Sequence, residues 1–169
     1  FAALMMVQAA RIKREAEAKQ RVSEFLTELF QVSDPSEARG NSITARELLD
    51  KGAAKIRGTL ADDPKVQADL MMTMGTVYLN LGLFPQAEPL LKEALETRRR
   101  RLGKEDPETL RAANETAWLY FLQGRARESE TLQRETLDIQ RRVLGPEHPD
   151  TLGSMYNLAC AAALQGKRE

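Results

Sequence analysis

The chain has 169 residues, of which 42% are hydrophobic and 30% are charged, and 25 Lys and Arg balance 25 Asp and Glu. A chain of this length and composition can bury a core, which excludes a disordered tail and a collagen-like fibre. The formal charge of zero gives no general attraction to nucleic acid or to an anionic membrane. The single Cys160 excludes an internal disulfide, and the single His148 excludes a zinc site built on a His pair.

The amino-terminal segment predicts one long helix. Residues 1 to about 31 contain neither Gly nor Pro, and Ser33-Asp34-Pro35 then breaks the helical pattern. The second half of this helix carries an apolar stripe that should pack on the helices that follow, formed by Val22, Phe25, Leu26, Leu29 and Phe30.

The first nine residues are apolar and are followed by basic residues, namely Arg11, Lys13 and Arg14. Nine residues cannot cross a bilayer, because a spanning helix needs about 20. They are therefore either the end of a membrane span that begins before Phe1 or an ordinary apolar helix end. Because the chain does not start with Met and has flanking cations, we favour the first interpretation.

A second helix is predicted from about Thr44 to Leu60, where Thr44 and Glu47 have the spacing of a capping box. From residue 65 onward the sequence repeats itself every 42 residues. Leu102-Gly-Lys-Glu-Asp-Pro-Glu-Thr-Leu110 returns as Leu144-Gly-Pro-Glu-His-Pro-Asp-Thr-Leu152. Such a period is the signature of a repeat architecture. We divide the chain into a long helix and linker (1–41), a degenerate capping repeat helix (42–64), two full repeats (65–106 and 107–148) and the first helix of a third (149–169).

Each full repeat has the start and stop signals of two consecutive helices. In the second repeat Asp106 is placed to cap a helix that begins at Pro107 and ends near Gly124, where a residue without Cβ can adopt a left-handed conformation. A second helix is predicted from about Arg125 to Val143, and its counterpart in the first repeat runs from Pro85 to about Leu102. Because no strand pattern occurs, the predicted fold class is all-α.

The repeat resembles the tetratricopeptide repeat (TPR), whose pattern is Trp-x2-Leu-Gly-x2-Tyr followed by Ala-x3-Phe. The residues at these places are Met71, Met74, Gly75, Tyr78, Ala87 and Leu91 in the first repeat and Ala113, Thr116, Ala117, Tyr120, Ser129 and Gln133 in the second. Gln133 departs from the apolar residue that the pattern requires. The 42-residue length resembles the repeats of kinesin light chains, and the resemblance implies a right-handed solenoid of antiparallel helix pairs.

The segment from Val22 to Ala53 resembles the part of bacterial serine/threonine protein kinases that links a membrane helix to such repeats. This resemblance implies a bacterial, membrane-tethered protein with a kinase domain before Phe1, on an undetermined side of the membrane. No Gly-rich loop, His-Arg-Asp or Asp-Phe-Gly occurs in the 169 residues, so any catalysis belongs to a domain outside this chain.

One face of the first helix in the second repeat carries residues that the packing pattern does not require. Asn114, Trp118 and Phe121 are spaced i, i+4, i+7, and large aromatic residues often anchor bound partners. The resemblance implies that Asn114 holds the backbone of a bound peptide. The predicted peptide-binding residues are Arg111, Asn114, Trp118, Phe121, Tyr156, Met72 and Asn80. The alternative is that the aromatic residues fill the floor of the groove or contact a further repeat.

A histidine and two clusters of arginines could suggest catalysis or phosphate binding, but we predict structural roles for them. His148 lies between Glu147 and Asp150, but it aligns with Asp106, so we predict that it caps a helix. The arginines at 98–101 and 141–142 lie in the last turns of helices, where cations favour the helix dipole, so we predict solvated helix ends.

The sequence therefore predicts a module that binds a peptide or protein segment on the concave face of a helical array. We expect no catalytic residue, metal, cofactor or nucleic acid, and no membrane contact by the repeats. The alternative function is structural: self-association through the repeats or the long helix, including a weak homodimer through the last helix, whose partner helix would follow residue 169.

Overall fold

The computed structural model describes residues 2–31, 44–59 and 63–166. The described residues form seven α-helices and no strand: α1 (Ala2–Gln31), α2 (Ala45–Thr59), α3 (Pro64–Asn80), α4 (Phe84–Leu102), α5 (Pro107–Leu122), α6 (Ala126–Val143) and α7 (Pro149–Gly166). The predicted all-α class is confirmed, and the ends predicted for α1, α2, α4, α5 and α6 lie within two residues of those observed. Among the described residues, no helix is both long enough and apolar enough to cross a lipid bilayer.

The chain separates into two compact units, residues 1–70 and 71–169. In the first unit α1 contacts α2, and the buried side chains include Phe25 and Ile56. Of the predicted apolar stripe on α1, Phe25 is 3% exposed, while the side chains of Leu26, Leu29 and Phe30 lie outside the described residues.

The start of α2 confirms the predicted capping box. The backbone N–H of Glu47 donates to Thr44 Oγ1 at 3.2 Å, and the backbone N–H of Thr44 donates to Glu47 Oε2 at 2.8 Å. The backbone hydrogen bond from Thr44 also lowers the pKa of the Glu47 carboxyl.

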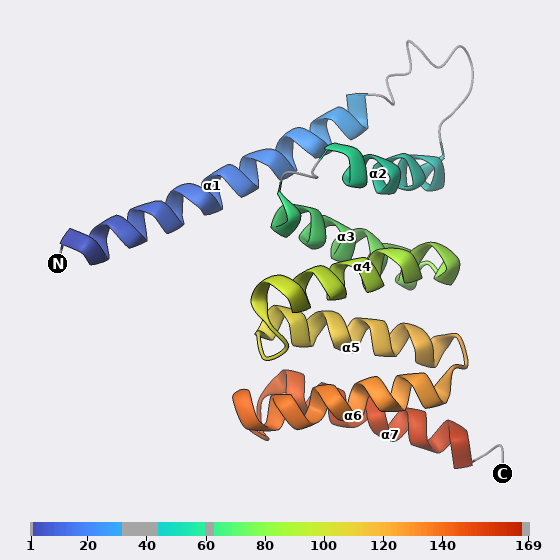
Figure 1. Ribbon diagram of the computed structural model, residues 1–169. Helices are drawn as coiled ribbons and strands as arrows, with labels where there is room; N and C mark the ends of the chain where they lie inside the picture. Colours follow the sequence, from blue (N-terminus) through green and yellow to red (C-terminus); the bar gives the residue numbers. More distant parts are fainter. Residues whose placement is uncertain (1, 32–43, 60–62, 167–169) are drawn as a thin grey trace. The chain divides into compact units, whose positions relative to one another are not determined.

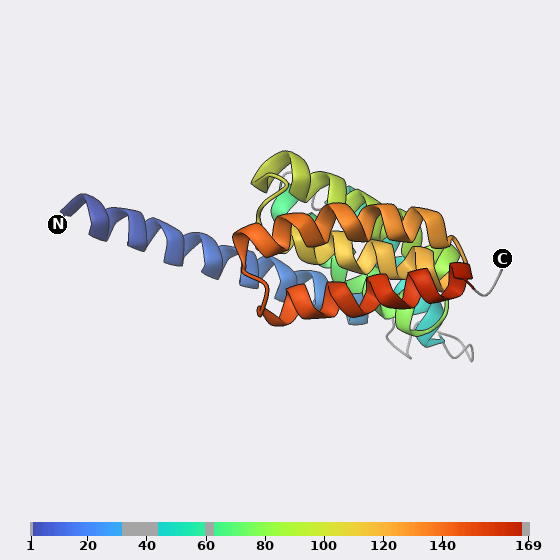
Figure 2. The ribbon, with the colours of Figure 1, turned by 90° about the horizontal axis from the view of Figure 1, so that it is seen from below.

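In the second unit the helices from α4 to α7 pack against one another in chain order, and α5 also contacts α7 (Figures 1 and 2). The turns inside the helix pairs are alike, because each is closed by a glycine with positive φ. Gly82 has φ 71° and Gly124 has φ 76°. The next residue in each turn donates back into the helix, Leu83 N–H to the Tyr78 carbonyl at 2.9 Å and Arg125 N–H to the Tyr120 carbonyl at 2.8 Å.

The starts of α5 and α7 are also alike, which confirms the two predicted caps. Asp106 Oδ1 accepts from the backbone N–H of Glu108 at 2.8 Å, and His148 Nδ1 accepts from the backbone N–H of Asp150 at 3.2 Å. Each cap satisfies an N–H that the helix itself leaves without an acceptor. His148, which could suggest catalysis, therefore caps the start of α7.

The predicted solvated end of α4 is wrong at Arg98, and the next residue, Arg99, is only partly exposed. Arg98 is only 4% exposed, and its guanidinium donates to the backbone carbonyl of Glu108 at 3.0 Å and lies 3.4 Å from the Glu108 carboxylate. The helix dipole argument does not foresee this contact, because the start of α5 folds back beside the end of α4. Arg98 therefore joins one helix pair to the next, whereas Arg100 and Arg101 are exposed as predicted.

The departure from the repeat pattern at Gln133 lies in the core. Its equivalent in the first repeat, Leu91, packs so closely on Gly75 that a Cβ there would lie 2.7 Å from the leucine side chain. Gln133 is 0% exposed, and neither its amide nitrogen nor its amide oxygen has a hydrogen-bond partner among the described residues. A buried amide without partners lowers stability.

We therefore expect Gln133→Leu to raise the free energy of unfolding by about 1–2 kcal/mol, because it replaces a desolvated amide with an apolar group of similar size. Urea denaturation followed by circular dichroism measures the difference. A loss of stability in this variant would contradict the prediction, since it would mean that the native amide is satisfied in solution.

Candidate functional site

The aromatic pair predicted on α5 forms a single stacked surface. The ring centroids of Trp118 and Phe121 are 4.8 Å apart, and the ring planes are inclined by 16°. Both side chains are half-buried, while the residues that pack α5 on its neighbours, such as Ala113 and Ala117, are buried. Trp118 lies on a different side of the helix from these small residues, since it follows Ala117 by about 100° of rotation. Phe121 follows Ala117 by one turn and lies at the edge between the two sides.

Asn114 lies on the same side of α5 and is held by α7. The Ser154 hydroxyl is 2.8 Å from Asn114 Oδ1 and 3.0 Å from the carbonyl oxygen of Asp150, so its one proton is donated to either of these acceptors in turn. When Oδ1 accepts this proton, the two N–H groups of the Asn114 amide remain as donors. Asn114 can therefore donate to a carbonyl oxygen of a bound chain.

The other predicted residues differ in their accessibility. Arg111 is exposed, and its guanidinium donates to Glu108 Oε2 at 2.7 Å, so an intramolecular carboxylate already engages it. Tyr156 on α7 is 68% exposed, and Asn80 at the end of α3 is exposed. Met72 is only 6% exposed and presents almost no surface to a partner. The structure thus gathers Arg111, Asn114, Trp118 and Phe121 on one side of α5.

Sequence reasoning missed Glu115, which follows Arg111 by four residues and precedes Trp118 by three on α5. The side chain is half-buried, and its burial raises the pKa of the carboxyl, which the charge of Arg111 lowers only in part. Its spacing to Arg111 and Trp118 was the available signal, since residues three and four apart on a helix are neighbours.

The raised pKa of Glu115 has a consequence for stability. A carboxyl whose pKa is raised by folding stabilises the fold below its unfolded-state pKa, near the ordinary value of 4.5, and this contribution is lost as pH rises through the folded-state pKa. We therefore expect Glu115→Gln to be more stable than the native chain at neutral pH. The gain should shrink as pH falls towards 4.5. Urea denaturation at several pH values measures it, and a gain independent of pH would contradict the assignment.

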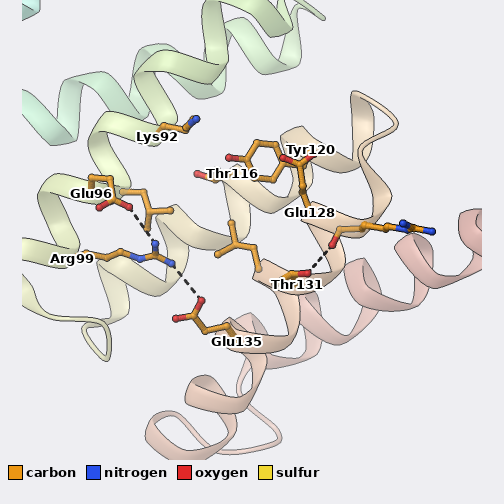
Figure 3. Close-up of a pocket in the computed structure, with 11 residues that line it drawn as sticks. Lys92, Glu96, Arg99, Thr116, Tyr120, Glu128, Thr131 and Glu135 are labelled. Carbon is orange, nitrogen blue, oxygen red and sulfur yellow. Dashed lines mark hydrogen bonds and ion pairs between the residues drawn. The ribbon is translucent and has the colours of Figure 1, made fainter.

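A hollow of about 410 Å³ lies between α4, α5 and α6 (Figure 3), and neither Trp118 nor Phe121 lines it. It is lined by apolar and aromatic side chains, Leu95, Tyr120 and Leu132, and by polar and charged ones, Lys92, Glu96, Arg99, Thr116, Arg127, Glu128, Thr131 and Glu135. Figure 3 shows Arg99 reaching between Glu96, at 3.2 Å, and Glu135, at 3.8 Å. The Arg99–Glu135 ion pair joins α4 to α6 across the hollow.

A second bridge joins the other end of α4 to Arg125, the residue just before α6. Arg125 donates to Glu88 Oε1 at 2.8 Å, and its guanidinium carbon lies 4.2 Å from the centre of the Tyr120 ring. Hydrogen bonds from Arg125 and then Gln123 lower the pKa of the Glu88 carboxyl. The ion pairs Arg99–Glu135 and Arg125–Glu88 thus tie α4 to α6 and to the residue before it. The α5 surface, which keeps a donor amide and a carboxylate without a hydrogen bond among the described residues, is the better candidate for binding.

The family model for the tetratricopeptide repeat matches residues 66–139 and 119–169. A crystal structure of a kinesin light chain with nearly identical TPR-like repeats from Podospora anserina is 24% identical, with 86% of this chain and 67% of that chain covered and a TM-score of 0.65. A variant of that Podospora anserina protein is 22% identical, with 95% and 84% covered and a TM-score of 0.62. BtubC (BKLC) from P. vanneervenii is 18% identical, with 91% and 68% covered and a TM-score of 0.61.

These structural likenesses show the fold, a solenoid of TPR-type helix pairs like those of kinesin light chains. None of the proteins of curated function is similar enough in sequence to count as a relative. The family model covers more than half of the chain, and arrays of such repeats are protein-interaction modules. This chain is a member of the tetratricopeptide repeat family.

Proposed function

We propose that the chain binds an extended segment of a partner protein on the side of α5 that carries Arg111, Asn114, Trp118 and Phe121. The stacked Trp118–Phe121 pair carries the proposal. Its two rings are half-buried, 4.8 Å apart, and lie outside the small-residue positions that pack the helix. Aromatic side chains of this kind supply much of the binding energy at protein interfaces, because they offer a large rigid area at a low entropic cost.

The polar residues around the pair support binding of a backbone. Asn114 keeps amide N–H groups for a peptide carbonyl while Ser154 fixes its oxygen. Tyr156 on the neighbouring α7 and Asn80 at the end of α3 extend the proposed surface, and both are exposed. We omit Met72 from the surface because it is buried.

A peptide array tests this proposal. The array carries capped peptides of varied sequence and is probed with the labelled chain, and the peptides that bind are then titrated in solution. We expect some peptides to bind the native chain and to lose affinity when Trp118 is replaced. Binding that is the same with and without the Trp118 ring would contradict the proposal.

Self-association is the alternative function, and the exposure of α7 favours it. Leu152, Met155 and Tyr156 are 51%, 40% and 68% exposed. In α5 the residue equivalent to Met155 is Ala113, which is only 4% exposed. Sedimentation equilibrium at several concentrations tests this alternative. A dimer that Met155→Glu dissociates would support it, and a monomer at every concentration would reject it.

The resemblance of residues 22–53 supports a proposal about the wider protein, that these repeats belong to the non-catalytic region of a bacterial serine/threonine kinase tethered to a membrane. The gene sequence before the codon for Phe1 tests it. We expect a kinase domain followed by an apolar span of about 20 residues. A different domain in that place would contradict the proposal.

A further inference from the structure

The arrangement of Glu115 beside Trp118 leads us to infer that the partner segment carries a basic side chain, Lys or Arg, which Glu115 binds while the alkyl part of that side chain lies on the Trp118–Phe121 rings. This inference rests on the proposed function and specifies its ligand. It concerns charge, which the aromatic pair alone does not determine.

The first reason is that Glu115 lacks a close counterion in the fold. It is half-buried and forms no hydrogen bond among the described residues. Arg111, one turn earlier, is its nearest source of positive charge, but the Arg111 guanidinium donates to Glu108 at 2.7 Å. The carboxylates of Glu88 and Glu105, in contrast, each accept from an arginine at 2.8 Å. Glu115 is therefore free to accept from a partner.

The second reason is the cost of this arrangement to the free chain. Partial burial of a carboxylate disfavours its charged form, and the raised pKa of Glu115 shows that the fold does not compensate for this. A glutamine would lie on this helix without the penalty. A cation delivered by a partner would offset it, because the charged carboxylate would then be paired and hydrogen-bonded.

The third reason is the aromatic surface next to the carboxylate. Glu115 and Trp118 are three residues apart on α5, and side chains at this spacing are neighbours on a helix. The face of an indole ring attracts cations, and the stems of Lys and Arg pack well on apolar surface. The same chain already uses this contact internally, since the Arg125 guanidinium lies 4.2 Å from the centre of the Tyr120 ring. An acidic side chain in this place would be repelled by Glu115.

The test uses an array of nonapeptides with acetylated and amidated ends, in which the central residue is Arg, norleucine or Glu and the flanking residues vary. We expect Arg-centred peptides to dominate among the binders. In solution, Glu115→Gln should weaken an Arg-centred binder about tenfold, as expected for loss of a partly desolvated charge pair. The norleucine-centred version of the same peptide should be affected less than threefold by this substitution. Glu115→Lys should shift the preference to Glu-centred peptides.

The matched control is Glu147→Gln, since Glu147 is an exposed carboxylate in the loop before α7. It should leave every affinity unchanged, and denaturation curves should show that both glutamine variants fold. If the binders depend on Trp118 but favour Glu at the centre, or respond equally to Glu115→Gln and Glu147→Gln, the inference about charge is overturned while the proposed function stands. If no binder depends on Trp118, the proposed function itself fails.

Discussion

Replacing Arg98 with alanine is expected to lower the free energy of unfolding by about 3 kcal/mol. The native guanidinium is almost fully buried and donates to the Glu108 carbonyl at the start of α5, at 3.0 Å. The substitution removes this hydrogen bond and leaves a space where the side chain lay between two helices. Chemical denaturation monitored by circular dichroism measures the loss.

The neighbouring Arg100→Ala is the control, because Arg100 is exposed on the same helix and has the same charge. Arg100→Ala should change the free energy of unfolding by no more than about 0.5 kcal/mol. Arg98→Met keeps most of the apolar stem, so its free energy of unfolding should lie between those of Arg98→Ala and Arg100→Ala. If the Arg98 and Arg100 variants unfolded at the same denaturant concentration, the contact between α4 and α5 would add nothing to stability.

The second large effect is expected in binding. Trp118→Ala should weaken a peptide selected from the array by at least about 2 kcal/mol, which corresponds to about thirtyfold in the dissociation constant. The ring is half-buried against Phe121 and lies outside the positions that pack α5, so the variant should still unfold cooperatively. Isothermal titration calorimetry with the native chain and the variant measures the difference.

Arg100→Ala again serves as the control, since it removes a side chain at the end of α4 and should leave the affinity as it is. Two results would contradict the prediction. Equal affinity of the native chain and Trp118→Ala would show that the ring makes no contact with the peptide. Loss of cooperative unfolding in Trp118→Ala would show that the ring belongs to the core.

The features that sequence predicted well are those set by a few neighbouring residues. Asp106 and Pro107 start α5, and Gly124 ends the turn after it, because a cap, a missing N–H and a positive φ each act within one helical turn. The 42-residue repeat then predicted that His148, the equivalent of Asp106, also caps a helix, although histidine is a less common cap than aspartate.

The features that sequence predicted poorly depend on what lies across from a residue in space. Met72, Asn114 and Tyr156 occupy equivalent places in successive repeats, yet Met72 is 6% exposed, Asn114 is half-buried and Tyr156 is 68% exposed. Periodicity establishes equivalence but does not establish the neighbours of each copy. The same limit explains why Arg98 was expected in solvent and why Glu115 was overlooked.

The joints on either side of residues 107–148 are the same piece of architecture. Before α5 and before α7 the chain passes through a glycine with φ near 90°, then a capping side chain, then a proline that opens the helix. DNA encoding this unit could therefore be duplicated in frame, and each new copy would find a matching junction at both of its ends. Unequal recombination would lengthen such an array one helix pair at a time, and a longer array could contact a longer stretch of a partner protein.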